Sequence, residues 1–255
     1  MNPEAVFGLS SKTANTEAFL NYVAEQEGFA HMQEASSNVE KEVLDAQHRH
    51  WESTFSNTPG MFGEGASDAA RKAAEVFKQE GKTKILELGA GQGRDTLFFA
   101  QNGFQVYALD YCEAGVENIT RKAEEMGLSH SITPMCHDLR TPLPFDDESF
   151  DGCYSHMLYC MALITSELEF LSDEVWRVLR PGGLSIYTVR HTNDPHYGTG
   201  IHRGEALYEI GGFIVHFFSE EKVEHLAKGY EVLSIDTFEE GKLPRKLFRV
   251  TLRKN

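Results

Sequence analysis

The stretch "ILELGAGQGRDTLFFA" (residues 85–100) joins a short apolar run, a glycine-rich turn and the beginning of an amphipathic helix. The run "ILEL" is typical of a buried strand, and "RDTLFFA" carries apolar residues at helical spacing. Gly89, Gly91 and Gly93 allow the backbone of the turn to approach a ligand closely. The N-terminal end of a helix follows, and its dipole favours negative charge. This strand–turn–helix unit therefore predicts a ligand-binding loop in an α/β fold.

The spacing of these glycines differs from that of a dinucleotide-binding fingerprint. The fingerprint GxGxxG requires its third glycine five residues after the first. This chain has Arg94 at that position, and its third glycine is Gly93. A nicotinamide-dependent oxidoreductase on a similar sheet is therefore a disfavoured alternative, which an assay of NAD(H) binding would distinguish.

Short apolar runs alternate with helical stretches from residue 82 onward. Helices are predicted over 93–101, 113–126, 166–179 and 219–228, the third opening with a capping box of Ser166 and Glu169. This alternation predicts a mainly parallel sheet with helices on both faces. The last two runs have no helix between them, which predicts an antiparallel hairpin at one edge. The seven runs are 84–89, 105–111, 131–138, 150–156, 182–190, 230–236 and 246–254.

The N-terminal region differs from the rest of the chain in composition. Residues 1–80 are polar and helix-prone, and they predict a helical cap ahead of a core formed by residues 81–255. Helices are expected over 15–29, over 37–55 with a capping box of Ser37 and Glu40, and over 67–81. The asparagine, proline and glycine content of 56–65 predicts a loop.

Composition excludes several classes of partner. The formal net charge is −15, and no basic patch is visible, so neither nucleic acid nor an anionic membrane is an expected partner. The four cysteines show no CxxC pair, which favours free thiols in a reducing compartment. The first residues lack a basic start followed by an apolar segment, and no apolar run is long enough to span a bilayer. The protein is expected to be cytoplasmic.

Three acidic residues stand in register with the glycine turn. Glu87 precedes Gly89 by two residues, Asp110 ends the second run, and Asp138 follows the third. A carboxylate at the end of the second strand can accept hydrogen bonds from both ribose hydroxyls, and one after the third can accept from an exocyclic amine. Each of the three acidic residues could alone be a loop or helix cap, but together they predict a nucleoside-containing ligand.

These residues resemble those of the class I S-adenosylmethionine (SAM)-dependent methyltransferases, over about 82–190 and more loosely beyond. The resemblance implies a Rossmann-like seven-stranded sheet of order 3-2-1-4-5-7-6, with strand 7 antiparallel. It also implies SAM as cofactor and S-adenosylhomocysteine as product. Asp110 would take the ribose, Asp138 the adenine amine, and the glycine turn the methionine part. The implied cofactor residues are Glu87, Gly89, Gly91, Gly93, Arg94, Asp110, Tyr111, Asp138, Leu139 and Ser155.

The variant "GQGR" (91–94) is similar to the branch containing the tellurite-resistance and thiol methyltransferases. In that branch, a segment ahead of the first core strand folds over the cofactor, and "HWESTFSNTPGMFGEG" (50–65) fits its outline. The resemblance implies that Trp51, Phe55, Pro59 and Phe62 close the site, although aromatic residues at this spacing also suit plain packing. It also implies a small-molecule acceptor, for example a thiol or a chalcogen or metalloid species. Such soft anions need little beyond alignment and desolvation.

The acceptor is expected at the carboxyl ends of the fourth and fifth strands, where open parallel sheets bind ligands. His156, Tyr159, Arg190 and His191 would lie near the methyl group, with His156, Tyr159 and His191 as catalytic candidates. For His156 and Tyr159, a satisfied or packed core residue is the competing interpretation.

The segment 191–218 is longer than a plain connection, and its glycine and aromatic content predicts an ordered lid. Trp51, Arg190, His196, His202 and His216 are the candidate acceptor-binding residues. The spacing of His191, His196 and His202 by five and six residues fits no helix face or zinc knuckle, so no metal is predicted.

Two other functions remain open at this stage. An O- or N-methyltransferase would need a base, which a lid histidine could supply. A SAM-binding protein without catalysis would bind the cofactor but show no turnover over a broad acceptor panel. The sequence specifies neither the acceptor atom nor an oligomeric state.

Overall fold

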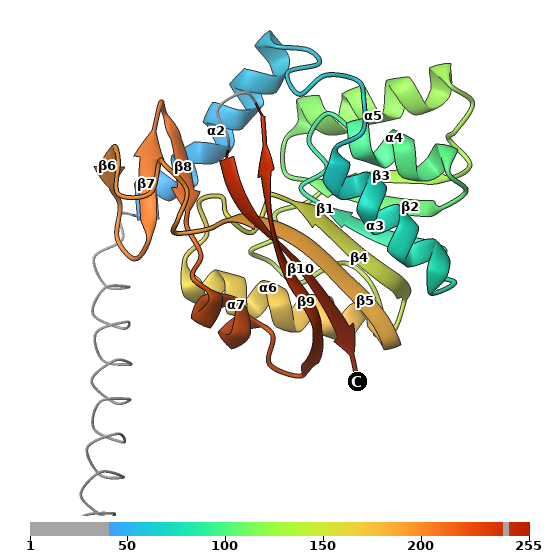
Figure 1. Cartoon of the computed structure of the whole chain (residues 1–255). Coiled ribbons are helices and arrows are strands. Elements are labelled where there is room, and N and C mark those ends of the chain that lie inside the picture. The colour runs from blue at the N-terminus through green and yellow to red at the C-terminus, as the bar shows by residue number, and fades with distance from the viewer. Residues whose placement is uncertain (1–40, 242–244) are drawn as a thin grey trace, which may run out of the picture.

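A computed structural model describes residues 41–241 and 245–255 (Figure 1). Two predicted features, the helix over 15–29 and the capping box of Ser37 and Glu40, lie outside these ranges. Of the described helices, none is both long and apolar enough to cross a membrane.

A seven-stranded sheet forms the centre of the molecule. Its spatial order is β3-β2-β1-β4-β5-β10-β9, which confirms the order predicted from the sequence. The first five strands in this order pair in parallel, and β10 pairs antiparallel with both β5 and β9. The strands are β1 (Lys84–Leu88), β2 (Gln105–Asp110), β3 (Ile132–Cys136), β4 (Phe150–His156), β5 (Leu179–Arg190), β9 (Tyr230–Glu240) and β10 (Arg245–Lys254).

Helices cover both faces of this sheet, as the alternation of runs predicted (Figure 1). One apolar core lies between the sheet and the pair α6 (Thr165–Val178) and α7 (Glu220–Leu226). The other lies between the sheet and the helices α3 (Asp68–Gln79), α4 (Arg94–Gln101) and α5 (Glu113–Glu125). These cores are built from the leucine, isoleucine, valine and phenylalanine side chains of the strands, whose burial stabilises the fold.

One helix begins differently from its prediction. The chain enters α6 at Ile164, and the carboxylate of Glu167 accepts a hydrogen bond from the Ile164 backbone N–H. The predicted capping box of Ser166 and Glu169 is therefore wrong, because the helix begins earlier than that box requires. Glu169 instead contacts His225 of α7.

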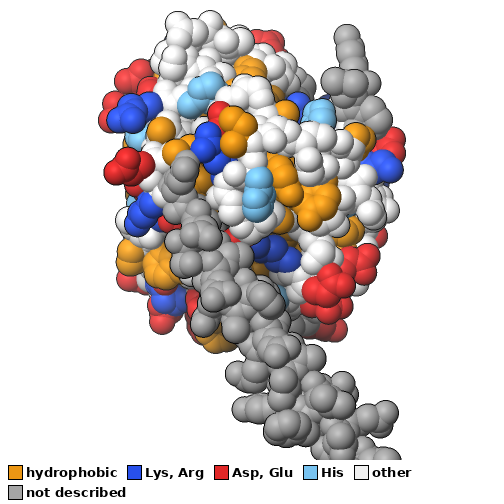
Figure 2. Space-filling view, turned by 90° about the vertical axis from the view of Figure 1, so that its left-hand side faces the viewer, with side chains coloured by type: hydrophobic (Ala, Val, Ile, Leu, Met, Phe, Trp, Pro, Cys, Tyr) orange, Lys and Arg blue, Asp and Glu red, His pale blue; other side chains and the backbone are white. Residues whose placement is uncertain are grey.

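The segment after β5 folds as a small three-stranded antiparallel sheet. Its strands are β6 (Ile201–His202), β7 (Leu207–Ile210) and β8 (Phe213–His216). In Figure 1 this lid sheet stands beside the central sheet and against α2 (Lys41–Asn57). Gln47 of α2 donates to the Gly212 carbonyl and accepts from the Ile214 N–H. Histidine, hydrophobic and basic side chains are mixed on the outer face of this part of the molecule (Figure 2).

Candidate functional site

The glycine turn joins β1 to α4 in a backbone conformation that favours glycine. Gly89, Gly91 and Gly93 all have positive φ, at 70°, 55° and 85°. A Cβ atom on Gly89 would lie 2.8 Å from Cβ of Leu158, and one on Gly93 would lie 2.5 Å from Cγ1 of Ile119. The turn thus needs glycine both for its dihedral angles and for the close approach of neighbouring segments.

Asp110 ends β2 directly beside this turn. Its Oδ2 accepts a 2.7 Å hydrogen bond from the Gly91 N–H, and its Oδ1 accepts a 2.9 Å bond from the Cys112 N–H. The side chain is buried, and desolvation raises the pKa of its carboxyl despite these backbone donors. Each oxygen keeps an acceptor position, so the carboxylate can still bind two hydroxyl groups.

A cavity opens at this edge of the sheet, over the carboxyl ends of β1, β2 and β4. It includes several predicted site residues: Trp51, Phe55, Phe62, Gly89, Gly91, Asp110, Tyr111, Asp138, Leu139 and His156. The strands bring the residues at their ends together because parallel strands end at the same edge of a sheet, and α2 and the loop after it add Trp51, Phe55 and Phe62. The remaining walls are Leu44, Asp45, Gln47, His48, His137, Arg140, Met157, Leu158, Met161, Ala162 and Leu163.

The cavity wall includes an ion-pair network. Arg140 donates to both carboxylate oxygens of Asp138, at 2.7 Å from Nη2 to Oδ2, and also pairs with Asp45 of α2. Despite some burial, the Arg140 side chain holds the pKa of Asp138 below its ordinary value. The ring of Tyr111 stacks on that of His48 at a centroid distance of 4.6 Å. Asp45 and His48 bring α2 against the loops that follow β2 and β3.

Two predicted cofactor residues have buried polar atoms that bond no other described residue. These atoms are Oε2 of Glu87 and Oγ of Ser155. Both residues lie near the carboxyl ends of adjacent strands, where Leu88 pairs with Ser155. Burial raises the pKa of Glu87 well above its ordinary value, and the nearby carboxylate of Asp95 adds to this shift. Buried polar atoms without protein partners are rare and often face water or a ligand.

Arg94 lies outside the cavity lining, contrary to its predicted place among the cofactor residues. Its Nη1 donates a 2.9 Å hydrogen bond to the carbonyl of Phe62, and its guanidinium lies 5.7 Å from the centre of the Phe62 ring. Arg94 therefore holds the aromatic loop that covers the site. Pro59 is an exposed residue of the same loop and does not line the cavity.

His156 lines the cavity, but both of its ring nitrogens have partners. Nδ1 lies 2.8 Å from Oγ1 of Thr188, and Nε2 lies 3.3 Å from a carboxylate oxygen of Glu240. Thr188 Oγ1 also accepts a 3.0 Å bond from the N–H of Met157, whose φ is 64°. In this arrangement His156 positions the chain at the end of β4, and neither of its nitrogens is free to act as a base.

Two predicted catalytic residues lie in the packed interior. Tyr159 is buried and stacks on Tyr187 at 4.6 Å between ring centres. His191 is buried against Phe248, and its Nδ1 accepts a bond from the Asn193 N–H. Burial lowers the pKa of His191. The structure brings neither residue to the cavity.

The predicted acceptor residues at the end of β5 and after it also have structural partners. Arg190 forms a buried ion pair with Asp194, and His196 Nδ1 lies 2.9 Å from the Arg190 guanidinium. His202 contacts the Glu205 carbonyl. His216 is buried between the Leu163 carbonyl and the Lys222 ammonium, and its pKa falls to about 3 mainly because of burial. None of the four lines the cavity, and each has a partner within the protein instead.

Sequence reasoning missed the part of the cavity wall that comes from the middle of α2 and from the turn after β4. Leu44, His48 and Trp51 recur at three- and four-residue spacing, which could have indicated one face of a helix. Only Trp51 was predicted. Met161 and Leu163 follow β4 in a segment whose direction depends on the turn at Met157.

Comparisons with known proteins agree with this architecture. Residues 85–183 match the family model described as "Methyltransferase domain". A 24-methylenesterol C-methyltransferase 2 of Oryza sativa subsp. japonica is 27% identical over 207 residues, which cover 75% of this chain and 54% of that protein. Phosphoethanolamine N-methyltransferase 1 of Triticum aestivum is 39% identical over 106 residues, covering 40% and 20%. The chain spans about half the length of the sterol methyltransferases it matches.

Solved structures show the same fold. A Burkholderia thailandensis 1,6-didemethyltoxoflavin-N1-methyltransferase, solved with S-adenosylhomocysteine, aligns with a TM-score of 0.66 and 19% identity over 84% of this chain and 90% of that one. TehB from Haemophilus influenzae aligns with a TM-score of 0.59 and 17% identity, over 78% and 64%. Residues 85–183 are therefore a methyltransferase domain, and the chain has the fold of the class I S-adenosylmethionine-dependent methyltransferases.

Proposed function

We propose that the chain transfers a methyl group from SAM to a small-molecule acceptor. The observation that carries this proposal is the common cavity of Gly89, Gly91 and Asp110 at the carboxyl edge of the sheet. SAM supplies a methyl group on a positively charged sulfur, which an acceptor attacks in line. The matched methyltransferase domain contains this same glycine loop.

The residues present suit SAM. Asp110 has free acceptor positions for the ribose hydroxyls, and Tyr111 and Leu139 supply flat or apolar surface for the adenine. Asp138 would accept from the adenine amine, and Arg140 favours the carboxylate form of its side chain by lowering its pKa. Oε2 of Glu87 and Oγ of Ser155 are buried without a described partner beside the glycine turn, and we assign them to the methionine part.

The acceptor end of the cavity favours a molecule with an apolar body. The apolar part of the cavity wall, to which we assign the acceptor, is formed by Leu44, Trp51, Leu158, Met161 and Leu163. The histidine at this end, His156, has both nitrogens bonded, so deprotonation of an acceptor by this side chain is disfavoured. A soft nucleophile that needs little base assistance, such as a thiol or a chalcogen species, suits such a wall.

A SAM-consumption screen tests both parts of this proposal, the methyl transfer from SAM and the class of acceptor. The panel contains aryl and alkyl thiols, selenite, tellurite, arsenite, phenols and amines, with phosphoethanolamine and a 24-methylenesterol added because matched relatives carry those names. Turnover with apolar thiols above the other compounds is the expected result. Turnover restricted to phenols or amines would exclude the soft-acceptor class while keeping the methyltransferase.

The alternative of a lid histidine acting as base has less support. His191, His196, His202 and His216 all lie off the cavity, and His216 is neutral at ordinary pH because its pKa is about 3. Replacing His202, an exposed residue of the lid, should leave turnover unchanged. A large loss of turnover with intact SAM binding would restore this alternative.

A further inference from the structure

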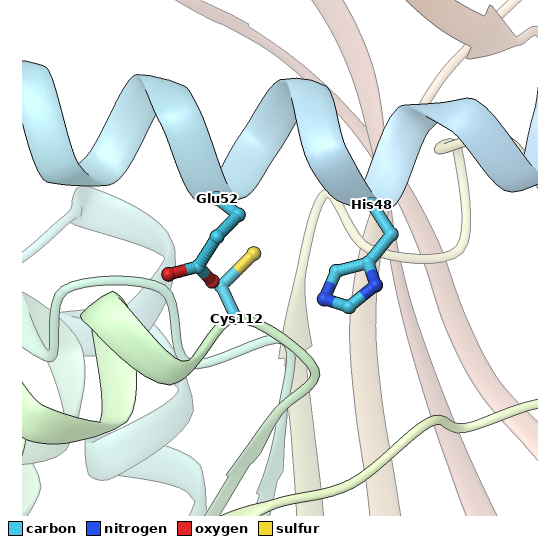
Figure 3. Close-up of side chains that lie close together, drawn as sticks. All are labelled: His48, Glu52 and Cys112. Carbon is cyan, nitrogen blue, oxygen red and sulfur yellow. The ribbon is translucent and has the colours of Figure 1, made fainter.

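A group of three potential metal ligands lies between α2 and the start of α5, separate from the histidine-rich segment after β5. His48 and Glu52 come from α2, and Cys112 precedes α5 (Figure 3). One possible ligand atom from each lies within 4.8 Å of the others. We propose that these three side chains bind one divalent transition metal ion, most favourably Zn²⁺.

The charges around this group call for a cation. Oε2 of Glu52 is a buried atom that bonds no other described residue. Asp110 lies next to Cys112 in space, because its Oδ1 accepts a 2.9 Å hydrogen bond from the Cys112 N–H. Over residues 41–241 and 245–255, no lysine or arginine forms an ion pair with Glu52 or Asp110. A divalent ion would neutralise the Glu52 carboxylate and a Cys112 thiolate together.

The three ligand atoms lie within 4.8 Å of one another, a looser arrangement than that of a bound tetrahedral site. His48 and Glu52 are four residues apart, so their side chains share one face of α2, as Figure 3 shows. Zinc ligands at about 2.0 to 2.3 Å from the metal place their own atoms roughly 3.3 to 3.8 Å apart. Binding would therefore need the ligand atoms to approach one another by up to about 1 to 1.5 Å, a movement that we assign to rotation of these side chains.

Each ligand has a structural partner that leaves coordination possible. His48 Nε2 lies 3.0 Å from the Tyr111 carbonyl, so a metal would bind through Nδ1 or replace that bond. Glu52 Oε1 accepts a 3.1 Å bond from the Ala114 N–H, and Oε2 is the oxygen left for the metal. When the metal–sulfur bond forms, the Cys112 thiol gives its proton to solvent.

Donor chemistry selects the class of metal. A thiolate, an imidazole and a carboxylate form a mixed set that suits Zn²⁺ or Co²⁺ and disfavours Mg²⁺ and Ca²⁺, which prefer oxygen ligands. Three protein ligands leave the fourth position to water. These three ligands join α2 to the loop after Asp110. The bound metal would therefore hold α2 against the part of the cavity that contains Asp110.

Metal titration of the full chain tests this proposal. The chelator-treated protein is titrated with Co²⁺ and then Zn²⁺ in the absence of SAM. One equivalent of Co²⁺ should bind, with a thiolate-to-cobalt charge-transfer band that one equivalent of Zn²⁺ removes. The expected effect of C112S is loss of the band, and that of H48A or E52Q is an affinity lowered at least tenfold.

Matched controls separate this site from others. C136S removes the exposed cysteine near the group, and H137A removes a cavity histidine outside it; both should keep the band and the stoichiometry. The exposed His48 makes H48A the variant least able to disturb folding, and circular dichroism checks all five. Absence of one-to-one binding, a cobalt spectrum without the thiolate band, or unchanged binding by H48A would overturn the proposal. Since no step uses SAM, failure of the methyltransferase proposal would leave these results intact.

Discussion

At the scale of single residues, two buried carboxyl groups beside the glycine turn differ in their partners. Asp110 receives backbone N–H groups at both oxygens, whereas Oε2 of Glu87 bonds no other described residue. Burial raises the pKa of both, and for Asp110 the two backbone donors oppose the shift. The backbone donors of Asp110 therefore favour its carboxylate form against burial, whereas burial and the Asp95 carboxylate both favour the neutral form of Glu87.

Replacement of Asp110 by alanine should weaken binding of S-adenosylhomocysteine at least tenfold. The variant loses the oxygens proposed to accept from the ribose, and a tenfold change corresponds to about 1.4 kcal/mol. Isothermal titration calorimetry measures the affinity, with D146N as a control at an exposed position away from the cavity. Equal affinities of D110A and wild type would exclude the assigned cofactor position.

Glu87→Gln should stabilise the protein at alkaline pH. The pKa of Glu87 is raised in the folded state above 4.5, so folding takes up a proton between the unfolded and folded pKa values. The wild-type contribution to stability is therefore lost as pH rises through that window, and the neutral amide avoids this loss. Urea unfolding at pH 5 and pH 8 should show a larger advantage of E87Q at pH 8. The same advantage at both pH values would show that Glu87 is ionised in the folded protein.

At the scale of elements, the β1–α4 turn shows how one motif serves folding and binding at once. Gly93 begins α4 and lies against Ile119 of α5, so it fixes the packing of two helices. A Cβ on Gly91 would lie 3.5 Å from the Phe55 ring, at ordinary contact distance within the cavity wall. The two positions therefore have separable effects.

Gly91→Ala and Gly93→Ala provide that separation. Both place alanine in left-handed backbone, which costs about 1 to 2 kcal/mol. G93A adds a clash with Ile119 and should lower the free energy of unfolding by about 3 kcal/mol. G91A should cost less stability yet weaken S-adenosylhomocysteine binding tenfold or more. Chemical unfolding and calorimetry on both variants check this, and a larger stability loss in G91A would contradict it.

The turn after β4 depends on a side chain of the neighbouring strand β5. Thr188→Val keeps the shape of the side chain but removes the oxygen that bonds His156 and the strained Met157. The loss should be about 1 to 2 kcal/mol in the free energy of unfolding, because buried groups lose a partner. T188S retains the hydroxyl and should lie near wild type. Urea unfolding of T188V and T188S measures this difference, and an equal loss of free energy of unfolding in both variants would assign the effect to packing.

The elements were largely predictable because their signals are local. The strand "ILEL", the glycine turn and the helix over 93–101 needed only periodicity and turn chemistry, and α4 begins within one residue of its prediction. The prediction of a capping box at Ser166 was wrong because a second possible helix start, at Ile164, lies only two residues earlier. The lid strands β6 and β7, of two and four residues, are too short for a periodic pattern, so only order was predicted for that segment.

At the scale of the whole molecule, the site depends on contacts between distant parts of the chain. Asp45 reaches Arg140 across 95 residues, and Gln47 reaches Ile214 across 167. Local patterns carry no information on such pairs, so the spacing of Leu44, His48 and Trp51 could mark one face of α2 but not what that face contacts. The same limit explains the lid histidines: position after β5 suggested contact with the acceptor, but packing turned His191 and His216 into the interior.

The assembled cavity should couple cofactor binding to the stability of the whole fold. A ligand that binds only the folded state at one hundred times its Kd adds about 2.7 kcal/mol to the free energy of unfolding. S-adenosylhomocysteine should produce this shift in urea unfolding, and NAD⁺ at the same concentration should produce none. For D110A at the same ligand concentration, a tenfold weaker Kd reduces the shift to about 1.4 kcal/mol. A full shift in D110A would show that the ligand binds elsewhere, and a comparable shift with NAD⁺ would favour a dinucleotide-dependent enzyme. Because the glycine loop, Asp110 and the α2 wall come from separate segments, the expected pattern requires all of them to fold together around the ligand.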